Sequence, residues 1–279
     1  MKARSKAKQA TKDTVLLLGA GRMGGALLQG WIASQSYSSI HVVEPAPSPA
    51  LKALASRKKI ALAKQFDPQL RPRAIVIALK PQVIKGEAAL LRELGKTGAL
   101  AVSIAAGITA GFLHNAFGPG ISVVRTVPNT PGAIGRGITA LYAPPGTAKA
   151  DRVLAEALMA TLGDTLWFDN EASMDAVTAI SGSGPAYVYL LAEALTHAGM
   201  AQGLAPEMAM RLARTTITGA GALLAADPRP AEELRRDVTS PAGTTEAALK
   251  VLMDKDGLET LMLRAVAAAA KRSKELGAN

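Results

Sequence analysis

Three glycines near the start of the chain have the spacing that binds a dinucleotide. Gly19, Gly21 and Gly24 form a G-x-G-x-x-G motif, after an apolar run at residues 15–18 and before an apolar segment with helical spacing. In a strand–turn–helix unit the first glycine permits the turn, the second lets the backbone approach a pyrophosphate, and the third lets helix and strand pack closely. The free N–H groups and positive dipole end of the helix then favour the phosphates. An ordinary glycine-rich turn is the alternative, because the chain has 26 glycines.

An acidic residue follows the motif at a distance that suits a ribose contact. A second apolar run, residues 40–43, ends at Glu44, about twenty residues beyond the third glycine. An acid at this position binds the hydroxyl groups of an adenosine ribose and repels a 2′-phosphate. Pro45 can turn this side chain away, however, and Lys52 or Arg57 can reach a phosphate. Both NADH and NADPH therefore stay open on the residues alone.

Composition excludes several kinds of site. The chain of 279 residues has no cysteine, and its three histidines, His41, His114 and His197, lie far apart in the sequence. We therefore expect no disulfide, no cysteine nucleophile and no metal site. No apolar run approaches the ~18 residues of a membrane span. We expect a cytoplasmic protein with no membrane partner.

Much of the net charge of +10 lies at one end of the chain. Residues 1–13 carry five basic side chains and one acidic side chain. Because they lack the apolar core of a signal peptide, we predict a disordered, solvated tail. A nucleic-acid-binding arm is the alternative, and it predicts salt-sensitive DNA binding that disappears with the tail. We expect no nucleic-acid partner.

Hydrophobic patterning divides the rest of the chain into two domains. Residues 14–170 alternate apolar runs with helical segments, which predicts a Rossmann-type, doubly wound and mainly parallel sheet. The predicted strands cover residues 15–18, 40–43, 74–79, 99–104, 122–127, 138–142 and 165–168. Residues 171–279 show helical periodicity throughout, and several segments are apolar around most of their circumference. Such helices need neighbours, so we predict an all-helical dimerisation domain and a ligand site made by one subunit's sheet and its partner's helices.

Residues that follow the predicted strands are candidates for cofactor contacts, because ligands bind at the carboxyl ends of parallel strands. Lys80 and Pro81 follow the third strand, and Asn129 lies between two prolines after the fifth. The lysine and proline can also be a simple strand terminator. Asn129 can equally hold a rigid turn or position a ligand.

Five stretches make the chain similar to the pyrroline-5-carboxylate reductases. They read GAGRMGGAL, ALKPQVI, VRTVPNTPGAIGRGITAL, ISGSGPAYVYLLAEAL and DVTSPAGTTEAAL, and the resemblance covers the chain from about residue 14 to 279. The resemblance implies reduction of 1-pyrroline-5-carboxylate to L-proline, the last step of proline biosynthesis, by hydride transfer from a nicotinamide cofactor, usually NADPH. Weighed against Glu44, it predicts NADPH with substantial use of NADH. It also implies a homodimer that often assembles into a decamer. The cofactor-binding residues that we predict are Gly19, Gly21, Arg22, Met23, Gly24, Glu44, Lys80, Pro81 and Asn129.

The substrate is expected in the turn SPAGTT. Gly243 permits a close backbone approach, and Thr244 or Thr245 starts the next helix, whose free N–H groups suit an anion. By resemblance, Ser240 and the backbone of Gly243 and Thr244 hold the substrate carboxylate, while the catalytic Thr245 hydroxyl contacts the ring nitrogen. An ordinary helix cap is the alternative.

Two features of the sequence argue against other classes of enzyme. The 3-hydroxyacid dehydrogenases share the layout of sheet and helices but use a lysine in the helical domain, and residues 171–249 contain none. ISGSG falls short of the G-x-S-x-G spacing of serine hydrolases, and we predict that Ser183 caps a helix and that residues 181–185 line a cleft. A non-catalytic protein that binds a nucleotide, as a sensor or an assembly subunit, is the alternative from another class. It needs no polar loop at residues 239–245.

Overall fold

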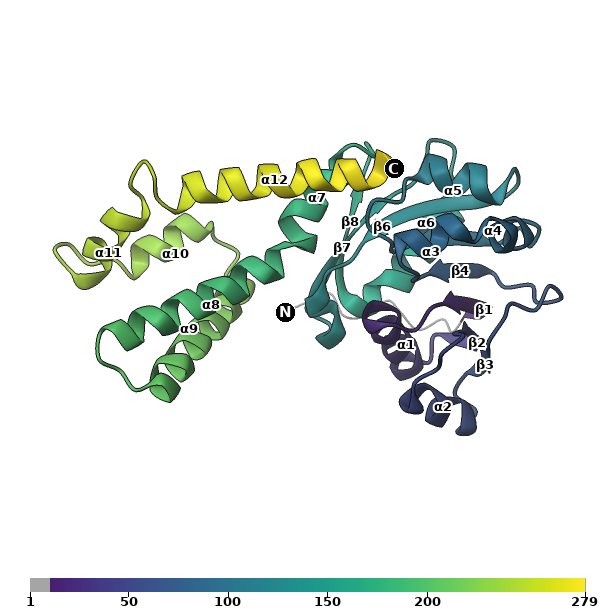
Figure 1. The fold of residues 1–279 in the computed structure, drawn as a ribbon, viewed down its shortest axis with the longest axis horizontal. Helices are drawn as coiled ribbons and strands as arrows, with labels where there is room; N and C mark the ends of the chain where they lie inside the picture. Colours follow the sequence, from purple (N-terminus) through teal and green to yellow (C-terminus); the bar gives the residue numbers. More distant parts are fainter. Residues whose placement is uncertain (1–10, 279) are drawn as a thin grey trace. The chain divides into compact units, whose positions relative to one another are not determined.

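The computed structural model describes residues 11–278, which fall into two compact units (Figure 1). The first unit contains residues 11–182 together with 270–278, and the second contains residues 183–269. The boundary lies later than the predicted 170/171, and the end of the chain returns to the first unit. Helical periodicity alone does not reveal this return, because the last helix looks the same on both sides of residue 270.

The first unit is built on one eight-stranded sheet with the order β3-β2-β1-β4-β5-β6-β7-β8. The strands are β1 (Thr11–Leu18), β2 (Tyr37–Val43), β3 (Ala61–Ala63), β4 (Ala74–Ile77), β5 (Leu100–Ser103), β6 (Ser122–Val127), β7 (Gly137–Tyr142) and β8 (Gly163–Phe168). Neighbouring strands are parallel except β6 and β7, which pair antiparallel. The predicted Rossmann-type sheet is confirmed. The strand missing from the prediction is β3, whose three residues are too few to show a pattern.

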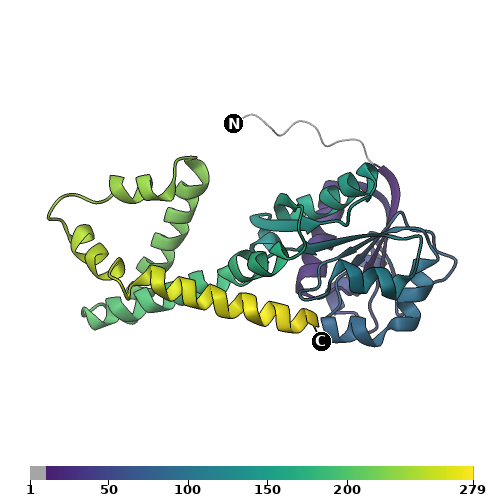
Figure 2. The ribbon, with the colours of Figure 1, turned by 90° about the horizontal axis from the view of Figure 1, so that it is seen from above.

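Helices cover both faces of this sheet, as Figure 2 shows. They are α1 (Arg22–Ser34), α2 (Pro49–Ser56), α3 (Pro81–Gly86), α4 (Ala88–Gly95), α5 (Ala110–Phe117), α6 (Lys149–Met159) and α7 (Ser173–Val177). Alternate residues of β1 face opposite layers: Val15 and Leu17 pack with α1, α2 and α6, whereas Leu16 and Leu18 pack with α3, α4 and α5. All four are at most 1% exposed, so the strand that carries the glycine motif lies at the centre of the core.

The predicted disordered tail falls mostly outside the described residues, since residues 1–10 are not described. The predicted end of the tail, residue 13, lies inside β1 (Thr11–Leu18) in the structure. Thr11 already belongs to β1 and pairs with Tyr37 of β2. The prediction missed this extension because lysine and aspartate interrupt the apolar pattern there.

The second unit consists of helices: α8 (Gly184–Ala201), α9 (Pro206–Ala226), α10 (Ala231–Asp237), α11 (Thr244–Leu252) and the first part of α12 (Leu258–Ala278). α8 and α9 lie side by side (Figure 1). Throughout residues 183–269, all of which the structure describes, the buried hydrophobic residues are only Ala209 and Ala213. Leu190 and Leu223, by contrast, are 64% and 69% exposed in the single chain. A helical unit with so small a core needs a partner to cover its apolar side chains.

Within residues 11–278 no helix has both the length and the apolar character required to cross a membrane.

Candidate functional site

The glycine motif forms a tight turn between β1 and α1. Gly19 has φ +85°, and a Cβ on it would lie 2.9 Å from the carbonyl oxygen of Ala78. A Cβ on Gly24 would collide with the carbonyl oxygen of Gly19 and lie 3.0 Å from the Ala78 Cβ. Both glycines are therefore required by packing against β1 and the end of β4.

Gly21 has a different reason to be glycine. It occupies the N-cap position of α1, and no protein atom lies within 4 Å of the place where its Cβ would be. The N–H groups of Arg22, Met23 and Gly24 have no acceptor among the described residues, and the first turn of α1 carries no acidic side chain. A bare helix N-terminus behind an open glycine fits a pyrophosphate. Of the other two predicted contacts, Arg22 is exposed, whereas Met23 packs against the core.

Glu44 is tied to the same turn. Its Oε2 accepts a hydrogen bond from the Ala20 N–H at 3.0 Å, and its Oε1 accepts one from the Ala46 N–H at 3.2 Å. Pro45 therefore does not turn the carboxylate away from the glycine loop. The acid stands beside the loop, as a ribose contact requires.

The predicted contacts at the ends of β4 and β6 differ in what they do. Lys80 is exposed at the N-cap position of α3, and Pro81 is the first residue of that helix. The Oδ1 atom of Asn129 accepts a hydrogen bond from the Ile138 N–H at 3.0 Å and so joins the end of β6 to β7. The carbonyl of this amide holds the turn, and its NH2 group has no acceptor among the described residues.

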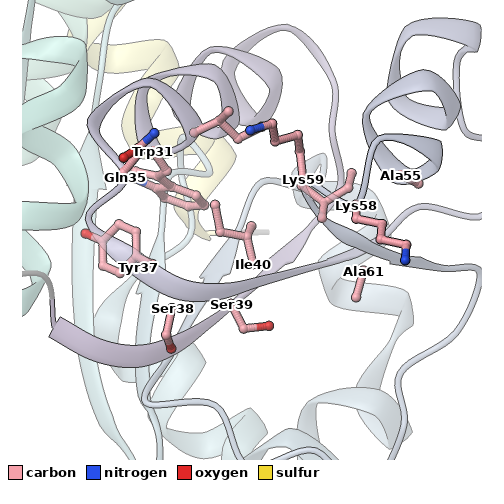
Figure 3. A pocket seen from close by; sticks show the side chains of 12 residues that line it. Trp31, Gln35, Tyr37, Ser38, Ser39, Ile40, Ala55, Lys58, Lys59 and Ala61 are labelled. Carbon is pink, nitrogen blue, oxygen red and sulfur yellow. The ribbon is translucent and has the colours of Figure 1, made fainter.

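A hollow of about 490 Å³ lies at the opposite edge of the sheet, at the start of β2 (Figure 3). Trp31 and Tyr37 pack edge to face on one side of it, and Lys58 and Lys59 lie on the other. Burial, and next the charge of Asp13, raises the pKa of Tyr37 to about 12. The carboxyl ends of α1 and α2 border this hollow, and helix C-termini repel phosphates, so the hollow does not suit a dinucleotide.

The predicted substrate turn lies in the second unit at the start of α11. Gly243 is the N-cap residue, and a Cβ on it would collide with the Ser240 hydroxyl. The N–H groups of Thr244, Thr245 and Glu246 have no acceptor within the described residues. The hydroxyl groups of Ser240, Thr244 and Thr245 likewise form no hydrogen bond there.

The backbone around this turn is held by other residues. Glu246 Oε2 accepts a hydrogen bond from the Ala242 N–H at 2.6 Å, and Ala242 has φ +58°. Before the turn, the Arg229 guanidinium bridges Asp227 and Asp237, each at 2.9 Å, so that the end of α9 is joined to the end of α10. The hydrogen bond from Arg229 lowers the pKa of Asp227 below its usual value. The turn is thus constrained while its donors at the helix start stay free to bind an anion.

The segment before α8 departs from the expected helix cap. Residues Thr178–Gly182 form a turn of π-helix, and Ser183 stands at the N-cap position of α8 without a side-chain capping hydrogen bond. Ser183 is at the predicted N-cap position, but its side chain does not make the expected capping hydrogen bond. The Ser181 hydroxyl donates a hydrogen bond to the Val177 carbonyl at 3.1 Å.

Comparison with known proteins covers nearly the whole chain. Residues 171–276 match the model of the pyrroline-5-carboxylate reductase dimerisation domain, and residues 14–107 match that of coenzyme F420-dependent NADP oxidoreductases. The chain is 39% identical to a pyrroline-5-carboxylate reductase of Pseudomonas aeruginosa over 94% of its length and 96% of the relative's. It belongs to the pyrroline-5-carboxylate reductase family.

Relatives and solved structures extend this comparison. A pyrroline-5-carboxylate reductase of Pisum sativum is 34% identical, with 94% of this chain and 96% of that protein covered. The solved reductase of Coxiella burnetii is 33% identical and superimposes with a TM-score of 0.85 over 95% of this chain and 98% of that one. The Plasmodium falciparum enzyme, solved with NADP bound, is 26% identical with a TM-score of 0.78, again with coverage of 95% and 98%.

Membership in the pyrroline-5-carboxylate reductase family confirms the prediction made from the five stretches. The chain is an NAD(P)-dependent oxidoreductase, and its helical unit is a dimerisation domain. The non-catalytic nucleotide sensor is not favoured. Among the described residues no cluster of acidic or histidine side chains is suited to a metal ion.

The sequence reasoning passed over one charged group, Arg125 on β6. This arginine is 2% exposed and pairs with carboxylates that are far away in the sequence. A signal was present, because a lone arginine in the strand SVVRTV must find a partner if the strand is buried. Nothing in the sequence, however, indicated which carboxylates would pair with Arg125.

Proposed function

We propose that this protein reduces 1-pyrroline-5-carboxylate to L-proline with hydride from NADPH and, less efficiently, from NADH, as the last step of proline biosynthesis. The observation that carries the proposal is the start of α11. Three N–H groups and three hydroxyl groups without a partner among the described residues lie there, in a turn flanked by the Ala242–Glu246 hydrogen bond and the Arg229–Asp237 ion pair. A small anion with one further polar atom, such as a cyclic imino acid, fits this set of donors.

The residues divide the work of the reaction. A reduced nicotinamide, when bound, supplies the hydride that the imine carbon accepts. Ser240 and the backbone at Gly243 and Thr244 hold the substrate carboxylate. The donor there is the Thr244 N–H, because the Gly243 N–H already donates to the Ser240 carbonyl oxygen at 3.1 Å. The Thr245 hydroxyl accepts a hydrogen bond from the protonated ring nitrogen, which takes up the electron pair of the C=N bond and becomes the amine of proline. No strong acid is needed, because the imine arrives already protonated.

The cofactor sites proposed are the predicted ones, with unequal support. Gly19 and Gly24 shape the turn, Gly21 leaves room for the pyrophosphate, and the N–H groups from Arg22 onward face it. Lys80, Pro81 and the NH2 group of Asn129 are proposed to line the nicotinamide side. Glu44, held by two backbone N–H groups, is the residue that opposes a 2′-phosphate, and Lys52 or Arg57 is proposed to offset it.

The first test follows cofactor oxidation as the loss of NAD(P)H absorbance when pyrroline-5-carboxylate is added. We expect turnover with both cofactors and a higher kcat/KM for NADPH. A large preference for NADH would show that Glu44 decides cofactor choice by repelling the 2′-phosphate. Binding of NAD(P)H without any turnover would instead favour the nucleotide sensor.

The proposed active site joins the cofactor half of one subunit to the substrate half of its partner. This arrangement predicts that two variants of low activity complement each other when the cofactor is not saturating. Co-expressed Gly21→Ala and Thr245→Ala chains form about one half mixed dimers, each with one intact site, so activity should return to about 25% of wild type. Separately purified variants, each assayed alone, are the control. A mixture no more active than its components would place both halves in one chain.

The assembly is proposed to extend beyond the dimer to a decamer, and the protein is proposed to act in the cytoplasm. Sedimentation at micromolar concentration separates two subunits from ten. An active monomer would contradict the shared site as well as the decamer.

A further inference from the structure

A buried charged cluster lies in the first unit, near the carboxyl end of β6. The Arg125 side chain is 3% exposed, and its Nη1 contacts Glu171 Oε1 at 3.2 Å while its Nη2 lies 3.9 Å from Asp175 Oδ1. Its Nε is buried without a partner among the described residues. Burying this guanidinium costs folding free energy, and its incomplete hydrogen bonds offset that cost only in part. A buried arginine that is retained at this cost suggests a role for the residue beyond stability.

Each of the two carboxylates also accepts a hydrogen bond from a different helix. Glu171 Oε1 also accepts a hydrogen bond from the Ala110 N–H at 2.7 Å, at the start of α5. Asp175 Oδ1 accepts one from the Ser273 hydroxyl at 2.7 Å, in the part of α12 that belongs to the first unit. Ser273 is 4% exposed, so this contact is shielded from water. Arg125 thus anchors two segments that are far apart in the sequence.

Both segments border the loop at residues 104–109, between β5 and α5. Gly107 in this loop has φ +74°, and a Cβ on it would lie 3.1 Å from the Leu276 Cβ. A Cβ on Gly277 would lie 3.2 Å from the Gly107 carbonyl oxygen. The end of α12 therefore packs directly on the backbone of the loop.

The loop at residues 104–109 lies where a bound nicotinamide would be expected, so the contacts of Arg125 that hold the loop can affect catalysis. The glycine turn follows β1, and Glu44 on the ribose side follows β2, so the opposite side of the crevice lies at the ends of β4 and β5. A dinucleotide bound across β1 places its nicotinamide half there. The loop at 104–109 begins at the end of β5.

We infer that Arg125 is a positioning residue for hydride transfer: through Glu171 and Asp175 it fixes the start of α5 and the end of α12, and these hold the loop at residues 104–109 on the nicotinamide side. Arg125 touches no ligand in this role. The inference rests on the proposed function only for its effect on turnover. The anchor itself is a property of the fold and can be measured without substrate.

The variants to compare are Arg125→Gln, Arg125→Lys and Ser273→Ala. The matched control is Arg73→Gln, which breaks another ion pair, Arg73 to Asp151 at 2.7 Å. That pair lies at the opposite edge of the sheet, since Arg73 directly precedes β4. Both arginine variants should lower Tm, so Tm alone does not test the inference.

Amide hydrogen exchange is the first measurement. Arg125→Gln and Ser273→Ala should speed amide exchange at residues 104–109 and 270–278 and leave exchange at residues 19–25 unchanged. Arg73→Gln should not speed exchange at residues 104–109 or 270–278. Turnover is the second: Arg125→Gln should lower kcat by up to about 100-fold, as a small displacement of a reacting group does, while the dissociation constant for ADP-ribose stays the same. Arg125→Lys should recover part of kcat. Ser273→Ala should add little to Arg125→Gln, because the two act through one chain of contacts.

Unchanged kcat in a folded Arg125→Gln protein, or exchange that rises equally over the whole first unit, would overturn the inference. If Arg125→Gln does not fold, Ser273→Ala carries the same comparison with a smaller change. An inactive wild-type protein would refute the proposed function, and the exchange measurement would still decide on the anchor.

Discussion

Thr245→Ala should lower kcat/KM for pyrroline-5-carboxylate by about 10- to 100-fold, with Tm and cofactor affinity nearly unchanged. The Thr245 hydroxyl makes no hydrogen bond within the described residues, so its removal takes nothing from the fold. A hydrogen bond to the charged imine is worth roughly 1.5 to 3 kcal/mol, which corresponds to that loss of rate. Steady-state kinetics with both substrates varied, together with thermal unfolding, measures the two effects separately.

Two further variants control this experiment. Thr245→Ser keeps the hydroxyl and should retain most of kcat/KM. Ser48→Ala removes a true helix cap, since the Ser48 hydroxyl accepts a hydrogen bond from the Leu51 N–H at 3.2 Å, and should cost about 1 kcal/mol of stability. If Thr245→Ala resembles Ser48→Ala, with lowered stability and normal kcat/KM for the imine, the SPAGTT turn is a helix cap and not part of the active site.

Gly21→Ala should give a folded protein that has lost most of its affinity for the cofactor. The new methyl group meets no protein atom within 4 Å, and φ at Gly21 is −66°, which alanine adopts without strain. Folding stability should therefore be unchanged or rise by about 0.4 to 1 kcal/mol. The methyl group enters the space proposed for the pyrophosphate, so KM and Kd for NADPH should rise about 10- to 100-fold as hydrogen bonds to a charged group are lost.

Neighbouring glycines separate this effect from a general disturbance of the loop. Gly25→Ala places a methyl group 3.7 Å from the Ala20 carbonyl oxygen, an ordinary contact, and should leave binding and stability near wild type. Gly24→Ala collides with the backbone of Gly19 and should destabilise the fold by about 1 to 3 kcal/mol. Calorimetric titration with NADPH and thermal unfolding of all three variants decide the matter. Normal NADPH affinity in Gly21→Ala would move the pyrophosphate away from this turn.

The sequence by itself determined the parts of this protein that depend on short stretches of chain. The turn at Gly19, Gly21 and Gly24 was predictable because its constraints are steric and act over six residues. The strands were predictable from their apolar runs, since buried parallel strands leave that pattern. The start of α11 at Thr244 was predictable because proline and glycine mark a helix boundary locally.

Only the tertiary structure decided which distant groups meet. Arg125 finds its carboxylate 46 residues away, and Asp175 finds Ser273 98 residues away. The antiparallel direction of β7 and the hydrogen bond from Ile138 to Asn129 follow from the path of the chain, which no local pattern encodes. The entropic cost of closing a loop rises only slowly with its length, so it does not favour one distant partner over another. The packing of whole layers therefore decides which distant side chains form contacts. The apolar circumference of the helices predicted that the helical unit needs a partner. The structure added that, within residues 183–269 of the single chain, only Ala209 and Ala213 are buried hydrophobic residues.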